Sequence, residues 1–322
     1  MEVKYIAYKL LFKSGLHIGE REEFYESSEK VIHSDAIFSA FVNGYNLLYG
    51  KDKTDELIRE TLKNPPFIIS STFPFYNKEG ENYYFFPLPK DQIPVLQEEK
   101  IDIKRLKKKE FVEKSIFEEL IDGESINSLK ILERLKINEE FYKEIIIPRV
   151  SLSRFSNHPL SEGDYFHFGE IRFKKGAGLY FLVEFNQPEF ENIFDTVMNL
   201  LQHEGIGGDR TIGKGLFKFE KEEISLKVPE DGEWHVTLSL YYPKEDEVED
   251  LREGFYELIE RRGYIFSPYS KTIKRDIVRM FVPGSVFPSK KEGKIEKVGE
   301  ILNQHSVYRY GLCFSLPYKR RK

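Results

Sequence analysis

Hydrophobic and polar positions in the first half of the chain alternate between the spacing of a strand and that of a helix. Residues 5–13 are rich in aromatic and branched side chains, which predicts a strand. A helix is predicted to begin at Ser34-Asp35, where the Asp35 carboxylate would cap free amides, and to end at Gly50. The clearest helix is predicted before Gly205, because apolar residues recur there at intervals of three and four. These residues are Phe190, Ile193, Phe194, Val197, Met198 and Leu201.

Two β-hairpins are predicted in the same half. Residues 67–75 and 83–88 flank Asn77-Lys78-Glu79-Gly80, which has the composition of a tight turn. Residues 145–155 and 165–173 flank a polar turn at 156–163, which indicates a projecting hairpin. The residues between the two hairpins, about 90–147, are rich in Lys and Glu, with helical stretches at 111–120 and 129–142. We interpret them, with the projecting hairpin, as an insertion covering about residues 90–175.

This order of elements predicts an α+β fold of tandem ferredoxin-like (RRM-like) domains with antiparallel sheets. The first domain is expected over residues 1–225, with the insertion inside it, and a degenerate second copy over 226–322. In the second copy a strand at 234–242 precedes a helix at 248–259. Strands at 264–269 and 277–287, a short helix at 295–303 and a closing strand at 310–316 are expected to follow.

Composition narrows the classes of function. The chain has 322 residues, of which 40% are apolar and 15% aromatic, so it can bury a sizeable core. Its single cysteine, Cys313, excludes an internal disulfide and a cysteine zinc site. No apolar run reaches the ~20 residues of a membrane helix, and the first residues lack the pattern of an export signal. We therefore expect a cytoplasmic protein without membrane contact.

The net charge of −5 argues against a general nucleic-acid coat, because non-specific binding needs a broad positive surface. Any RNA site must be local. Basic runs occur at 104–109, 271–275 and 319–322, but runs of this kind are usually solvated faces.

The segment from Gly205 to Gly215 is the main candidate for a binding site. It holds five glycines in eleven positions, together with Arg210 and Lys214. Glycine lets backbone amides approach a ligand closely, and the two cations suit phosphate, so the segment predicts contact with a sugar-phosphate backbone. It is not a nucleotide-binding P-loop, since it follows a helix and lacks Ser or Thr after its Gly-Lys. The alternative is a connector whose glycines serve flexibility alone.

The glycine-rich segment after the last helix of a ferredoxin-like unit resembles the signature of the RAMP superfamily of CRISPR-associated proteins. Further motifs resemble its Csm-type members, which act in type III-A effector complexes. They span most of the chain in order and are individually weak but strong together. The motifs are residues 14–19 (SGLHIG), 33–40 (HSDAIFSA), 73–75 (FPF), 86–89 (FPLP), 176–181 (GAGLYF) and 279–287 (RMFVPGSVF).

The resemblance implies a non-catalytic subunit that grips the 5′ handle of the guide RNA (crRNA). It also implies that this subunit bridges the large polymerase-type subunit and a backbone RAMP subunit in antiviral defence. The projecting hairpin would act as a thumb that displaces a base. On this interpretation His17, Arg149 and Arg154 contact RNA beside the glycine-rich segment. The residues expected to cradle the RNA are Gly207, Gly208, Asp209, Arg210, Gly213, Lys214 and Gly215.

Two other functions remain open at this stage. His17 lies in the turn after the first strand and could serve as general acid or base of a metal-independent repeat endoribonuclease. Exposed Phe and Tyr residues at 70–90 could instead make the chain a protein-interaction scaffold that touches no RNA. No cofactor is predicted, and no metal either, because the spacing of His158, Asp164 and His167 matches no zinc pattern.

Overall fold

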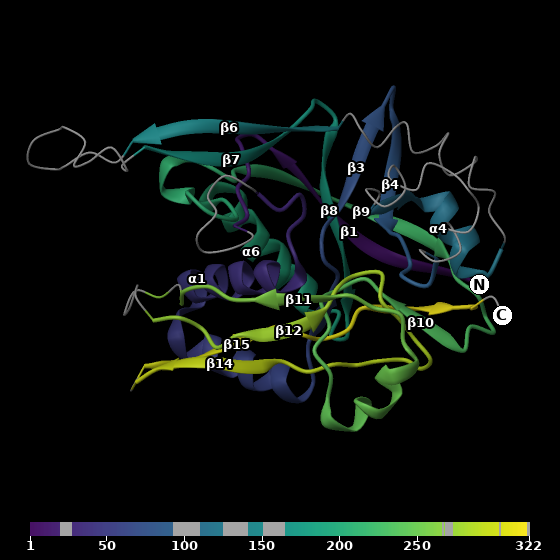
Figure 1. Cartoon of the computed structure of the whole chain (residues 1–322). Coiled ribbons are helices and arrows are strands. Elements are labelled where there is room, and N and C mark those ends of the chain that lie inside the picture. Colours follow the sequence, from purple (N-terminus) through teal and green to yellow (C-terminus); the bar gives the residue numbers. More distant parts are fainter. Residues whose placement is uncertain are drawn as a thin grey trace, which may run out of the picture.

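The protein is a mixed α+β structure in which strands predominate (Figure 1). The computed structural model describes residues 1–19, 28–92, 110–124, 141–150, 165–265, 267, 273–302 and 304–320. The expected α+β class is confirmed. Among the described residues, no helix is long and apolar enough to cross a membrane.

A seven-stranded antiparallel sheet forms the centre of the first half of the chain. Its strands lie in the order β5-β4-β3-β8-β1-β9, and β2 pairs with β8 beside β3. Strands β4, β3, β8 and β1 each have partners on both sides, whereas β5 and β9 form the edges. The strands are β1 (Glu2–Phe12), β2 (Phe67–Ile69), β3 (Phe73–Lys78), β4 (Glu81–Pro87), β5 (Phe111–Glu113), β8 (Ala177–Phe185) and β9 (Phe217–Lys227).

Alternation along the central strands divides the core into two layers. Tyr8 and Phe181 face the long helix α1 (Ser34–Lys63) and α6 (Phe190–Glu204), whereas Ala7 and Tyr180 face the short helix α4 (Lys114–Ile121) and the C-terminal half. Helices α1 and α6 approach closely at Gly44, where a Cβ would lie 3.0 Å from Val197 Cγ1. The sheet is therefore covered on both faces, and aromatic residues such as Tyr8, Phe73 and Tyr180 are buried.

The predicted helix that precedes Gly205 is confirmed as α6, and Gly205 follows it with a positive φ of 78°. The predicted hairpin at Asn77-Lys78-Glu79-Gly80 is confirmed as β3 and β4. Gly50 breaks the helical backbone as expected, with φ of 81°, but a further helical segment follows directly and continues α1 to Lys63. Residues 129–140 of the expected insertion helix lie outside the described residues.

A two-stranded arm extends from the sheet, as the sequence predicted. Strands β6 (Tyr142–Val150) and β7 (Tyr165–Phe173) pair along their whole length and project to one side of the molecule (Figure 1). The base of the arm is anchored at Leu16, whose backbone exchanges two hydrogen bonds with Ile171. The predicted turn at 156–163 lies outside the described residues.

The C-terminal half is built from small sheets and contains no α-helix among its described residues up to 320. The first sheet has the order β13-β10-β16, and two hairpins pair β11 with β12 and β14 with β15. The strands are β10 (Trp234–Thr237), β11 (Leu258–Arg261), β12 (Val278–Phe281), β13 (Val286–Phe287), β14 (Glu296–Ile301), β15 (His305–Arg309) and β16 (Ser315–Tyr318).

Both helices predicted for this half are wrong. Residues 248–259 form a 3₁₀ turn, η5 (Glu249–Glu253), and the start of β11, because Phe255 pairs with the backbone of Val286 instead of continuing a helix. Residues 296–301 form β14, and Val298 and Ile301 of this strand, with Ile295 just before it, are buried at helix-like intervals. A register shift between Lys297 and Gly299 produces this spacing in a strand. A second ferredoxin-like copy is therefore not confirmed.

A buried ionic cluster joins α1 to the C-terminal strands. Asp35 accepts two hydrogen bonds from Arg261, at 3.0 and 3.1 Å, and one from Arg309 at 2.6 Å. Glu29 accepts another from Arg261 at 3.1 Å. Burial raises the pKa of Asp35, but the two guanidiniums outweigh it and hold that pKa well below its usual range. We call Glu29, Asp35, Arg261 and Arg309 the junction cluster.

The expectation that Asp35 caps the helix is wrong. The helix N-cap is His33, which makes no side-chain capping bond. Asp35 lies in the first turn and is fully buried. Its carboxylate pairs with Arg261 and Arg309, which lie more than two hundred positions later in the sequence.

Candidate nucleic-acid interface

The glycine-rich segment is an ordered loop that packs on the turn after β1. The Gly208 amide donates to the carbonyl of His17 at 2.8 Å, and the Gly215 amide donates to that of Gly15 at 2.9 Å. Within the loop, the Ile206 amide donates to Gly215 at 3.0 Å. These bonds fix both ends of the loop to residues 14–19, a connection that the sequence did not reveal.

Three glycines of the loop are required by this packing. Gly205 has φ of 78°, and a Cβ there would fall 2.7 Å from the Lys214 carbonyl oxygen. Gly207 has φ of 92°, and a Cβ there would fall 2.5 Å from the His17 carbonyl oxygen. Gly215 has φ of 68°, and its Cβ would overlap the carbonyl of Ile206. Their immediate role is therefore close contact between backbone segments. Gly213 has open space around it, so glycine is favoured there only by the positive φ of 82° that the turn adopts.

The middle of the loop turns outward. Asp209 adopts a left-handed conformation with φ of 57°, and residues Arg210–Ile212 form the 3₁₀ turn η3. The amides of Ile212 and Lys214 both donate to the Asp209 carbonyl, which makes this turn compact. Among the described residues, the amides of Asp209 and Thr211 make no backbone hydrogen bond. Thr211 and Ile212 are exposed, so this turn is the part of the loop that a ligand can reach.

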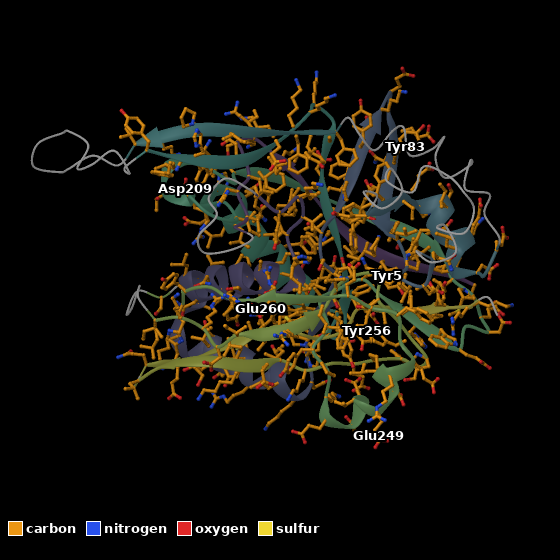
Figure 2. The ribbon with its side chains drawn as sticks, viewed as in Figure 1. Tyr5, Tyr83, Asp209, Glu249, Tyr256 and Glu260 are labelled. Atoms are coloured by element: carbon orange, nitrogen blue, oxygen red, sulfur yellow. The ribbon has the colours of Figure 1, made fainter. Side chains whose placement is uncertain are left out.

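Arg149 of the arm lies beside this turn. Its Nη1 donates to Asp209 Oδ2 at 2.5 Å, and its guanidinium stacks on the Phe168 ring with 3.7 Å to the centroid. Figure 2 shows Asp209 near the β6–β7 arm. The structure thus brings Arg149 to the glycine-rich loop, as the resemblance implied. Arg154 lies outside the described residues.

Lys214 points inward rather than outward. Its Nζ donates to Glu170, a fully buried carboxylate on β7, and Arg172 donates to the other oxygen of Glu170 at 2.5 Å. Burial raises the pKa of Glu170, but the hydrogen bonds from Lys214 and Arg172 outweigh it and lower that pKa. RNA contact by Lys214 stays a prediction, and this pairing weighs against it.

His17 lies beneath the loop and is only 6% exposed. Its Nδ1 donates to the Gly169 carbonyl at 2.7 Å, and its ring packs against Phe168 with centroids 4.2 Å apart. Burial lowers the pKa of His17, so the ring is neutral at pH 7. An imidazole enclosed in this way is suited to positioning the loop and is poorly placed to exchange protons with RNA.

Two residues of this region were missed from the sequence. Phe168 supports both Arg149 and His17, and Glu170 holds Lys214. Their signal was the alternation of β7, in which Phe166, Phe168 and Glu170 occupy every second position and so share one face. A carboxylate on the face that packs inward predicts a buried ionic partner.

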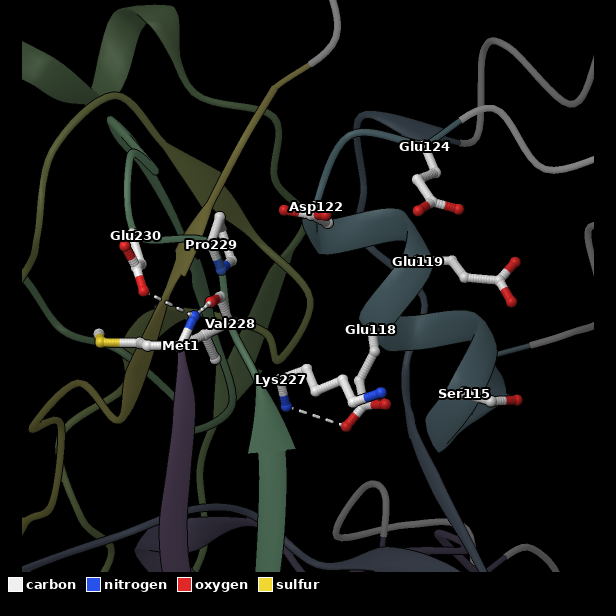
Figure 3. Close-up of a pocket in the computed structure, with 10 residues that line it drawn as sticks. All are labelled: Met1, Ser115, Glu118, Glu119, Asp122, Glu124, Lys227, Val228, Pro229 and Glu230. Carbon is white, nitrogen blue, oxygen red and sulfur yellow. Dashed lines mark hydrogen bonds and ion pairs between the residues drawn. The ribbon is translucent and has the colours of Figure 1, made fainter.

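A second hollow is acidic and unsuited to nucleic acid. It has a volume of about 660 Å³ and lies between α4 and the end of β9 (Figure 3). Its acidic residues outnumber its cations, and one of them, Glu118, accepts a hydrogen bond from the Lys227 amide at 3.0 Å. The acidic residues are Glu118, Glu119, Asp122, Glu124 and Glu230. Phosphates would be repelled here.

In the described part of the chain, no group of three His, Cys, Asp or Glu residues is arranged to hold a metal ion. His158 and Asp164 lie outside the described residues. The aromatic residues at 70–90 are largely buried, among them Phe73, Phe75 and Phe86, so the exposed aromatic docking surface expected there is wrong.

Comparison with known proteins confirms the resemblance to Csm-type RAMP subunits. Residues 230–318 match the family described as the CRISPR Csm4 C-terminal domain. The "CRISPR system Cms protein Csm4" of Thermococcus onnurineus is 28% identical over 88% of this chain and 90% of its own length. The protein of the same name from Methanocaldococcus jannaschii is 27% identical over 99% of both chains.

Solved structures show the same fold. A chain of the crystal structure of the Csm1-Csm4 cassette in complex with pppApA matches with a TM-score of 0.64 and 23% identity, covering 99% of this chain and 100% of that one. A chain of the Csm3-Csm4 subcomplex in the type III-A CRISPR-Cas interference complex matches with a TM-score of 0.63 and 20% identity, covering 98% and 100%. The chain is thus similar in sequence to Csm4 proteins of the RAMP type and shares their fold.

Proposed function

We propose that this chain is a non-catalytic subunit of a type III-A CRISPR interference complex and grips the 5′ handle of the guide RNA. The observation that carries the proposal is the anchored loop, whose two ends are tied to residues 14–19 while η3 faces outward beside Arg149. A preformed turn binds without a large ordering cost. Because the amides of Gly208, Ile212, Gly213, Lys214 and Gly215 donate inward, we assign the RNA contacts to Asp209–Thr211.

We infer that Arg210 supplies the charge at this turn and that Arg149 supplies a second cation at its edge. Contacts of this kind fix the position of a strand without reading its sequence. Gly207, Gly208, Gly213 and Gly215 then act by shaping the loop, and His17 by supporting it from below.

The two protein partners follow from the relatives. Csm4 chains occur in structures with Csm1 and with Csm3. We propose that this chain likewise bridges a large polymerase-type subunit and a backbone RAMP subunit. We also interpret β1, α1, β3, β8, α6 and β9 as one ferredoxin-like unit, because the strand order β3-β8-β1-β9 with two helices on one face has that topology.

Binding of a fluorescent RNA with the 5′-handle sequence tests the proposal, with the chain alone and with its complex. Arg210→Ala should weaken binding about tenfold and reduce the salt dependence by about one counterion. Arg252→Ala is the matched control, because Arg252 lies in another 3₁₀ turn, η5, of the opposite half. Equal affinity of wild type and Arg210→Ala in the complex would contradict the assignment.

The absence of catalysis is tested separately. The purified chain should leave repeat RNA intact in EDTA, because the enclosed and neutral His17 cannot reach a scissile phosphate. A specific cut that disappears in His17→Ala would establish the endoribonuclease instead.

A further inference from the structure

A cavity separate from the glycine-rich loop lies between α1 and the β14–β15 hairpin. Its volume is about 320 Å³. Figure 1 shows these two elements side by side in the lower part of the molecule. One wall is apolar and includes the rings of two aromatic residues. The apolar residues are Phe38, Val42, Ile58, Val307 and Tyr308.

The side chain of Arg275 lines this cavity and has no partner among the described residues. Its Nε is buried and makes no hydrogen bond, and its guanidinium forms no ion pair with a described residue. Burial and the neighbouring Arg309 lower the pKa of Arg275 to about 10. A buried donor without an acceptor is costly, and a buried charge more so.

The neighbouring carboxylates do not fully compensate Arg275, since Asp35 raises its pKa but burial and Arg309 outweigh this effect. The carboxylates of Asp35 and Glu29 are engaged by Arg261 and Arg309 in the junction cluster. At the rim of the cavity Lys51 and Asp55 pair with each other at 3.0 Å. The cavity therefore carries one excess positive charge beside an apolar wall.

We propose that this cavity binds a nucleotide, with a phosphate on Arg275 and the base against the wall formed by Phe38 and Tyr308. A guanidinium is the usual protein partner for phosphate. The volume lies at the lower end of small-molecule sites and exceeds what a lone phosphate or carboxylate fills. The nucleotide can be free or can be a terminal residue of an RNA strand, since both present the same groups.

Two asparagines on α1 fit the edge of a base. Asn43 Nδ2 donates to the Ser39 carbonyl at 2.6 Å, and Asn46 Oδ1 accepts from Thr54 at 3.3 Å. These bonds leave Asn43 Oδ1 and Asn46 Nδ2 as an acceptor and a donor. The two residues are three positions apart and lie on the same side of the helix. An amide acceptor and donor match the hydrogen-bonding edge of adenine, so AMP is the probe of choice.

Calorimetric titration of the full-length chain with AMP and with adenosine tests the site. AMP should bind, and Arg275→Gln should weaken it at least about tenfold, the loss of a charge-assisted contact. Arg279→Gln is the matched control, because Arg279 is 74% exposed on the neighbouring strand β12. A 5′-phosphorylated trinucleotide shows whether RNA ends are accepted as well, by competition with AMP.

Thermal unfolding gives a second test, because a variant that had merely lost structure would unfold at a lower temperature, not a higher one. Without ligand, Arg275→Gln should unfold at a higher temperature than wild type, because an uncompensated charge is removed. Saturating AMP should raise the unfolding temperature of wild type and leave that of the variant unchanged.

The proposal is overturned if wild type binds no AMP, if inorganic phosphate or adenosine binds as tightly as AMP, or if Arg275→Gln binds AMP like wild type. The site does not depend on the proposed grip on guide RNA. Arg210→Ala should bind AMP normally, and Arg275→Gln should keep the Arg210-dependent component of handle binding.

Discussion

The molecule uses arginine and carboxylate in two contrasting settings. At the glycine-rich loop, Arg149 and Asp209 pair at the surface, and both side chains keep partial exposure to water. In the junction cluster, Asp35 is fully buried and is shared by Arg261 and Arg309. Both sites contain short hydrogen bonds between the same chemical groups.

The difference in burial separates their roles. A half-exposed pair contributes little to stability and can exchange its partner for a ligand at small cost. A buried pair loses its solvation on folding and leaves an uncompensated charge when one partner is removed. We therefore expect damage at the junction cluster to appear in the free energy of unfolding and damage at the loop to appear in RNA affinity.

The largest expected effect comes from Asp35→Asn. This change keeps the size of the side chain but leaves Arg261 and Arg309 without their shared charge, so the free energy of unfolding should fall by about 3–5 kcal/mol. Urea-induced unfolding measures it. Asp55→Asn, which breaks the exposed pair with Lys51, should cost less than about 1 kcal/mol. An equal loss of unfolding free energy in the two variants would show that burial does not set the strength of these ion pairs.

The next effect concerns the glycines that hold the loop. Gly215→Ala places a methyl group on the Ile206 carbonyl at a positive φ, and should cost about 3 kcal/mol and abolish the Arg210-dependent part of RNA binding. Gly213→Ala has the same backbone strain and open space, so it should cost about 1 kcal/mol and retain that binding. Loss of binding in both variants would indicate that the tip itself needs glycine.

The buried Glu170 gives the loop a pH-dependent support. The folded pKa of Glu170 lies below its unfolded value, so its stabilising contribution is present above about pH 4.5 and is lost as the pH falls through the folded pKa. Lys214→Met should lower the free energy of unfolding by about 2 kcal/mol at pH 7, and by progressively less as the pH falls below about 4.5. Urea-induced unfolding at pH 7 and below about pH 4.5 measures this difference.

Lys218→Met is the control for that experiment. Lys218 is exposed, and its pair with Glu220 spans 3.3 Å at the surface. Its effect should be small at both pH values. A pH-independent cost for Lys214→Met would mean that Lys214 acts through packing of its stem rather than through its charge.

The smallest expected effect is a gain in RNA affinity. Asp209→Asn removes a negative charge beside η3 and keeps a residue that tolerates the left-handed backbone, so RNA affinity should rise about threefold with little change in stability. Salt titration of handle RNA measures the change, and Asp246→Asn in the opposite half is the control. A fall in affinity would show that the Asp209 carboxylate itself contacts RNA.

How far the sequence predicts the structure differs between the two halves. The helix α6 and the β3–β4 hairpin follow from local spacing, since one apolar face or one turn decides each of them. In the C-terminal half, Val298 and Ile301 show helix-like spacing because a bulge shifts the strand register. Local periodicity cannot reveal a bulge, which depends on the partner strand.

The site shows the same division. The glycine-rich loop was found from its composition, and the arm brought Arg149 to it as expected. The inward direction of Lys214 was not predictable, because its partner Glu170 lies 44 positions away on β7. The glycines were assigned to ligand contact, whereas Gly207 and Gly215 are needed first for contact with the chain itself.

The sequence separation inside the junction cluster has a consequence for biosynthesis. Asp35 and Arg309 are 274 residues apart. At about 5–20 residues per second, a ribosome needs on the order of 10–60 seconds between them. Until then the start of α1 lacks one of its arginines, and the nascent first half must persist with this helix incompletely docked. Completion of the fold is therefore expected only after Arg309 has been synthesised, and a chaperone that shields α1 during this interval would have its greatest influence on yield.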